Sequence, residues 1–137
     1  VDLRVLAIVI GQTPRPDLTA DLRELLPKTC HLDEVGALDG CSAETLSKYT
    51  SIEKRRRVDA CMLLTRLADG RRVEIPEPEL VPLLQAKIDA CTCEAGYHAT
   101  IILCAGRFHG IQSSPTSGPL LLPFDLASQL LLAKGYR

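Results

Sequence analysis

The chain has 137 residues, of which 46% are apolar and 24% charged, and its formal net charge is −1. This length has room for one domain with one core, so we expect residues 1–137 to form a single α/β domain. No apolar run approaches the ~20 residues that a membrane-spanning helix needs, and we predict no membrane association. The one basic cluster, residues 54–57, lies between Glu53 and Asp59. We interpret it as a solvated turn and predict no nucleic-acid partner.

Six cysteines could suggest a disulfide-rich secreted protein, but the sequence opens with a strand-like run instead of a signal peptide. Reduced thiols in a cytoplasmic protein fit better, with Cys61 and Cys104 as small apolar residues in buried strands. Cys91 and Cys93 form a CxC pair, and the second pair that a zinc site normally has is missing. We therefore predict no metal site.

The first half of the chain predicts a strand, a helix, a second strand and a short helix. Residues 4–10 form an apolar, partly β-branched run typical of a strand buried on both faces. Asp17 is the expected cap of a helix that Pro27 ends and that carries four leucines on one face, at positions 18, 22, 25 and 26. Residues 30–35 suit the next strand, and Ser42 suits the cap of a helix over 43–49.

The second half predicts a hairpin, a long helix, a strand and a terminal helix. Residues 61–65 and 71–75 flank the turn Asp69-Gly70 and would pair antiparallel, at an edge of the sheet. A helix from Pro76 to Gly96 repeats Leu80, Leu84, Ile88 and Cys91 at helical spacing. Residues 100–104 suit a buried strand, 110–123 a loop, and 124–134 an almost wholly apolar helix. The alternation predicts a three-layer α/β sandwich with a mainly parallel sheet of four or five strands and one antiparallel hairpin.

Two glycine-containing loops follow the strands that should be central, where open α/β sheets bind their ligands. The loop from Gly11 to Asp17 is neither GxGxxG nor a Walker loop, so we predict no nucleotide cofactor. Its donors would suit a smaller anion such as a carboxylate, although a plain tight turn is the alternative. In the second loop, Cys104 could act as a thiolate near Arg107, or could simply be a core cysteine at a strand end. Arg66 could point into the same cleft, or be a surface arginine before the hairpin.

Five strings in the same order over residues 4–108 resemble segments of the AroM family. Residues 10–17 resemble its IGQ(T/S)PRPD opening, 35–40 its GALDG segment, 64–70 its TRLxDG hairpin, 81–88 its PLLQxKI helix, and 101–108 its LLCTGxF strand end. Ala105 stands where the family commonly has Thr, which removes a hydroxyl beside Cys104.

The AroM family is distantly similar to the aspartate/glutamate racemase superfamily. That resemblance implies two flavodoxin-like lobes that hold a substrate carboxylate between them, with one cysteine from each lobe as paired acid and base. We expect residues 1–137 to resemble the first of these two lobes. It implies no cofactor, and Cys104 matches the position of the first-lobe cysteine. The expected function is therefore the binding of a small amino- or hydroxy-acid carboxylate, with racemase-like or isomerase-like proton transfer by Cys104. The alternative is a non-catalytic ligand-binding or regulatory protein of aromatic amino-acid metabolism.

The predicted substrate-binding residues come from three loops: Gly11, Gln12, Thr13 and Arg15, then Thr65 and Arg66, then Gly106. The apolar segment 119–133 exceeds what a solvent-facing helix tolerates. We expect it to be buried in a homodimer, with a fold back over the sheet edge as the alternative.

Overall fold

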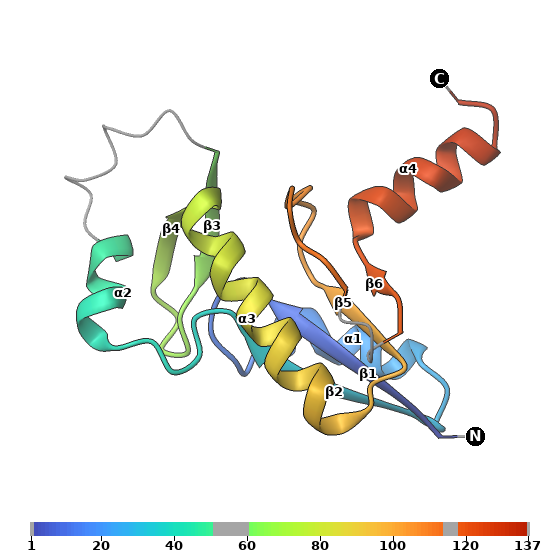
Figure 1. Ribbon diagram of the computed structural model, residues 1–137, viewed down its shortest axis with the longest axis horizontal. Helices are drawn as coiled ribbons and strands as arrows, with labels where there is room; N and C mark the ends of the chain where they lie inside the picture. The colour runs from blue at the N-terminus through green and yellow to red at the C-terminus, as the bar shows by residue number, and fades with distance from the viewer. Residues whose placement is uncertain (1, 51–60, 114–117, 137) are drawn as a thin grey trace.

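The computed structural model describes residues 2–50, 61–113 and 118–136, and for residues 91–95 it describes the backbone alone. Its main sheet has four parallel strands in the order β2-β1-β5-β6. These strands are β1 (Leu3–Val9), β2 (Cys30–Gly36), β5 (Ala99–Ile102) and β6 (Leu120–Leu121). Figure 1 shows α1 (Pro16–Leu25) on one side of this sheet and α3 (Glu77–Ala95) across the other. The predicted three-layer α/β architecture with a mainly parallel sheet is confirmed.

The antiparallel hairpin forms a sheet of its own, which differs from the expected place at an edge of the main sheet. Strands β3 (Met62–Arg66) and β4 (Arg72–Pro76) pair only with each other, in the register that places Thr65 opposite Val73. Helix α2 (Ala43–Thr50) and helix α3 both contact β4. The hairpin is therefore held against the rest of the protein by side-chain packing and a loop contact, and not by strand pairing with the main sheet.

One buried core connects both sheets through α3. Leu80, Leu84 and Ile88 on the inner face of this helix are fully buried, as their spacing predicted. They belong to one cluster with Ile8 of β1 and Val73 of β4. The predicted fourth member of that face, Cys91, has no described side chain. Burial of this single face holds the hairpin beside the parallel sheet.

Several local predictions are confirmed and others are not. Ser42 caps α2 by accepting a hydrogen bond from the Thr45 N–H (3.2 Å), and Gly96 ends α3 in the left-handed region, at φ 59°. Asp17 is not a cap, because α1 begins at Pro16 after Arg15. The leucine face predicted for α1 is also wrong, since Leu25 is exposed and the buried residue of the helix is Thr19. Cys61 is exposed instead of buried.

The C-terminal region departs most from the predicted pattern. Leu120 and Leu121 extend the sheet as β6, within a segment that we expected to be a loop. Helix α4 (Pro123–Ala133) then leaves the body of the molecule and has no buried residue (Figure 1). It does not fold back over the sheet edge. The basic cluster 54–57 lies outside the described residues, and no helix within the described ranges is long and apolar enough to cross a membrane.

The loop after β1 crosses the end of β3 at Gly11, where a side chain has no room. A Cβ built on Gly11 would overlap the carbonyl oxygen of Arg66 and lie 2.5 Å from Thr65 Oγ1. The neighbouring Gln12 N–H donates to the same Arg66 carbonyl (3.1 Å). Close backbone approach at a glycine thus fixes the hairpin against the parallel sheet.

We expect the substitution Gly11→Ala to lower the free energy of unfolding by about 1–3 kcal/mol, because the added methyl group must displace backbone. Amide hydrogen exchange should accelerate more in β3 and β4 than in β1 and β2. The control is Gly40→Ala, where the residue has φ 80° and no atom near a built Cβ, so strain should stay within its own turn. Unchanged exchange in the hairpin of Gly11→Ala would contradict the role given to this crossing.

Candidate functional site

A carboxylate on the turn after β2 holds the loop that follows β1. Asp39 accepts hydrogen bonds from the Thr13 N–H (2.9 Å), the Thr13 hydroxyl (2.6 Å) and the Gly36 N–H (2.7 Å). Gly36 itself packs against Gly11, since its Cβ would lie 2.5 Å from the Gly11 carbonyl oxygen. Two strand-end glycines and one carboxylate therefore set the path of residues 11–13.

The Gln12 side chain also bridges elements of the scaffold. Its Oε1 accepts from the Ala68 N–H (3.0 Å) in the hairpin turn, and its Nε2 donates to the Leu38 carbonyl (3.4 Å). Gln12 and Thr13, both predicted to bind substrate, thus make their described hydrogen bonds to the protein.

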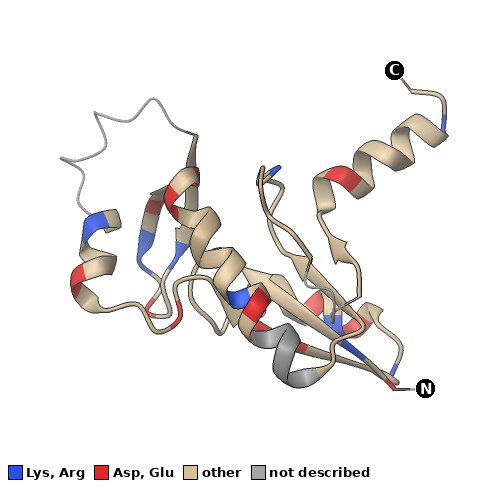
Figure 2. Cartoon of the chain, in the orientation of Figure 1, with Lys and Arg blue, Asp and Glu red and all other residues tan. Residues whose placement is uncertain are grey.

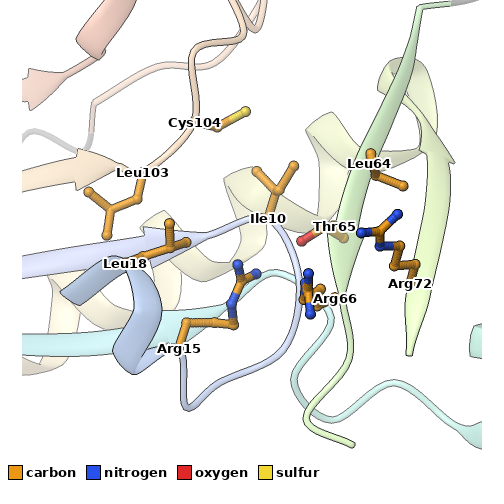
Figure 3. Close-up of a pocket in the computed structure, with 9 residues that line it drawn as sticks. All are labelled: Ile10, Arg15, Leu18, Leu64, Thr65, Arg66, Arg72, Leu103 and Cys104. Carbon is orange, nitrogen blue, oxygen red and sulfur yellow. The ribbon is translucent and has the colours of Figure 1, made fainter. Parts of the chain in front are cut away.

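A pocket of about 290 Å³ opens between this loop, β3 and the segment after β5. It brings together four of the eight predicted site residues, namely Arg15, Thr65, Arg66 and Cys104 (Figure 3). Gly11, Gln12, Thr13 and Gly106 do not line it. The residues that sequence reasoning missed are Arg72 and four apolar side chains, those of Ile10, Leu18, Leu64 and Leu103.

Arg15 is held at the pocket by carboxylates on either side. Its guanidinium donates to both carboxylate oxygens of Asp17, through Nε (2.8 Å) and NH2 (2.7 Å), and its backbone N–H donates to Glu34 Oε1 (2.6 Å). The hydrogen bonds from Arg15 are the main reason that the pKa of Asp17 lies below its usual value, against a smaller opposing effect of burial. Asp17 is therefore charged at neutral pH and occupies one edge of the Arg15 fork, which leaves the other edge for a ligand.

Arg66 and Arg72 lie directly opposite each other on the antiparallel pair β3–β4. Neither side chain forms an ion pair or a hydrogen bond with any residue in the described ranges, whereas the adjacent Arg71 pairs with Asp69 at 2.7 Å. Like charges at directly opposed positions destabilise a hairpin. Asp17, whose pKa Arg15 lowers most, is also within electrostatic reach of Arg66, but no salt bridge joins the two. Two arginines that line one pocket without such a salt bridge are a favourable arrangement for binding an anion.

Cys104 reaches the pocket from the opposite side (Figure 3). It is a free, half-buried thiol that follows β5, where the Leu103 N–H donates to the Ile8 carbonyl of β1 (2.8 Å). Gly106 has a packing role instead, because a Cβ there would lie 2.7 Å from the buried ring of Phe108. The segment thus places a nucleophilic atom at the pocket while its glycine fits against the core.

The arrangement can therefore hold an anion against arginines and present a thiol to it. Among the described side chains, no three His, Cys, Asp or Glu residues lie close enough to hold a metal ion. The side chains of Cys91 and Cys93 are outside the described part.

We expect Arg72→Gln to raise the free energy of unfolding by about 0.2–1 kcal/mol at low ionic strength, because it removes a like-charge pair. The gain should shrink with added NaCl, which screens charges over ~10 Å at 0.1 M. Urea denaturation measures both effects. Arg71→Gln is the matched control, since it breaks the ion pair with Asp69 and should not stabilise the protein. A loss of stability in Arg72→Gln would mean that Arg72 has a stabilising partner.

Comparison with known proteins gives one match. The sequence matches the family described as AroM protein over residues 5–133, which is nearly the whole chain. No curated protein and no solved structure matches it. The match covers every residue that lines the pocket, from Ile10 to Cys104. The chain belongs to the AroM family.

Proposed function

We propose that the pocket binds a small carboxylic acid and that Cys104 transfers a proton at the carbon next to the carboxylate. The observation that carries this proposal is the pair Arg66 and Arg72, which line the pocket without a salt bridge or hydrogen bond to a described carboxylate, across from a free thiol. Thr65 adds a hydroxyl that has no hydrogen bond to another described residue. A volume of about 290 Å³ suits a small metabolite.

The charge balance of the reaction explains why two unpaired arginines would be useful. The Cys104 thiolate takes the α-proton and becomes a thiol, while the electron pair of the C–H bond moves onto the carboxylate and doubles its negative charge. The thiol then returns a proton, or a deuteron after exchange with solvent, and is a thiolate again. The arginines attract the doubly charged intermediate more strongly than the singly charged acid. They therefore stabilise the transition state more than they stabilise the bound acid.

A second candidate is a protein that binds the same acid without chemistry, as a regulatory protein of aromatic amino-acid metabolism would. This second candidate is favoured because Cys104 is the single thiol among the residues that line the pocket. Full inversion by two bases needs another acid on the opposite face of the substrate. The pocket as described supplies one face, so we expect exchange of the α-proton to exceed racemisation.

Two substitutions separate binding from proton transfer. We expect Arg66→Gln to weaken carboxylate binding at least tenfold, measured by calorimetry, because it removes an ion-pairing fork from the pocket. Cys104→Ser should bind within about twofold of the wild type but lose deuterium exchange at the α-carbon in D₂O, followed by NMR over a panel of amino and hydroxy acids. Arg71→Gln, next to the pocket but paired with Asp69, is the control and should change neither property.

The results distinguish the candidates. Binding without exchange in the wild-type protein would support the regulatory protein and contradict proton transfer. Exchange that persists in Cys104→Ser would assign the chemistry to another group. Affinity unaffected by Arg66→Gln would remove the carboxylate site from this pocket.

We also propose that α4 associates with a second copy of the chain. Leu126, Leu130, Leu131 and Leu132 are exposed, and Figure 2 shows no charged residue in the helix between Asp125 and Lys134. An exposed apolar helix of this kind is a common association surface. The arrangement of the two copies has no bearing on the pocket argument above.

Light scattering tests this association. The substitution Leu130→Glu should shift the protein from dimer to monomer, because a carboxylate cannot be buried unpaired in the interface. Leu25→Glu, at an exposed leucine of α1, is the matched control and should leave the dimer intact. A wild-type monomer at high concentration would contradict the proposal.

A further inference from the structure

Aliphatic side chains lie among the arginines of the pocket. They are Ile10 after β1, Leu18 on α1, Leu64 on β3 and Leu103 after β5. Three of the nine lining residues are cations and four are aliphatic, and Figure 3 shows Leu64 beside Arg72 and Leu18 beside Arg15, so the pocket offers charge and hydrocarbon next to each other.

Leu64 is the most informative of these residues. Its side chain is 59% exposed, although the neighbouring position in the same strand, Thr65, is buried. Leu64 and Arg66 are two positions apart in β3, so they lie on the same face of the strand, while Thr65 between them is buried. A rise of ~3.3 Å per residue separates the two side chains by roughly 7 Å. This separation is about the distance between the carboxylate of a ligand and the middle of a short hydrocarbon group attached to it.

A second leucine repeats the arrangement on the other side of the pocket. Leu18 is 38% exposed and lies in the first turn of α1, three residues after Arg15, which precedes the helix. Each exposed leucine therefore lies two or three residues from an arginine of the pocket. Leaving aliphatic surface in water costs about 25 cal/mol per Å², a cost that an apolar ligand would remove.

Resting on the carboxylate site proposed above, we infer that its ligand is a monocarboxylic acid with an apolar body, aliphatic or aromatic, joined to the carboxylate by a short chain. The carboxylate meets the arginines and the body covers Leu64, Leu18 and Leu103. The pocket has the volume of about ten water molecules, which suits an acid with on the order of ten non-hydrogen atoms. The second carboxylate of a dicarboxylic acid would have to lie against aliphatic side chains and lose its hydration.

A homologous series tests the inference with the protein as it is. Calorimetry would compare acetate, butanoate, 4-methylpentanoate and 3-phenylpropanoate with succinate and glutarate. Each methylene that becomes buried is expected to raise affinity by up to about fourfold, and the dicarboxylates should bind more weakly than monocarboxylates of equal length.

The variant Leu64→Ser checks the location of the apolar body. It should lower the affinity for 3-phenylpropanoate about three- to tenfold and leave that for acetate within twofold. Because Leu64 is exposed, the polar replacement should not unfold the chain. Leu132→Ser, at an exposed leucine of α4 away from the pocket, is the control and should change neither affinity.

Failure of this inference is distinguishable from failure of the carboxylate site. If carboxylates bind and depend on Arg66, but affinity does not rise with chain length or dicarboxylates bind more tightly, the apolar-body inference is overturned and the carboxylate site stands. A slope with chain length that Leu64→Ser leaves unchanged also overturns it. If no acid of either series binds, both fall together.

Discussion

The close crossing of Gly11 with the end of β3 is the constraint on which the rest of the structure depends. The hairpin β3–β4 shares no ladder with the parallel sheet, so its position depends on this contact and on the α3 core. The crossing works only without side chains, because Gly11 meets the Arg66 carbonyl on one side and Gly36 on the other. Asp39 then satisfies the N–H groups of Thr13 and Gly36 that the tight path would otherwise leave without partners.

The same crossing creates the pocket. With the loop fixed against Arg66, the ends of β1, β3 and β5 face a common space that contains both the arginines and Cys104. Gln12 and Thr13 contribute by holding the walls, since their hydrogen bonds go to Ala68, Leu38 and Asp39. A segment that resembles an anion-binding loop in sequence is thus a scaffold for the residues that line the pocket.

The arginines at and beside the pocket are of two kinds, those with a salt bridge and those without one. Arg15 and Arg71 each bind an aspartate two residues away in sequence, which fixes them and neutralises them in part. Arg66 and Arg72 instead face each other across the hairpin and form no salt bridge with a described carboxylate, although Asp17 interacts with Arg66 over a longer distance. Such an arrangement weakens the hairpin and strengthens the binding of an anion, a combination often found at functional sites.

The sequence by itself determined the α/β class, the positions of most strands and helices, and family membership, because these depend on local periodicity and contiguous strings. It also placed Arg15, Thr65, Arg66 and Cys104 near one cleft. For Arg15 and Cys104 the reason holds that residues following strands gather at one edge of a parallel sheet, whereas Thr65 and Arg66 reach the cleft from the separate hairpin. Arg72 was not within reach of the sequence, because a two-residue turn at Asp69-Gly70 would place it opposite Leu67. In the structure residues 68–70 connect the strands, and Arg72 lies opposite Arg66. Only the tertiary structure decided that Gln12 and Thr13 turn to the scaffold, that the hairpin stands apart from the sheet, and that leucines lie among the arginines of the pocket. These features depend on contacts between residues 26 to 56 positions apart in the chain, such as those between Thr13 and Asp39 and between Gln12 and Ala68, which no local pattern encodes.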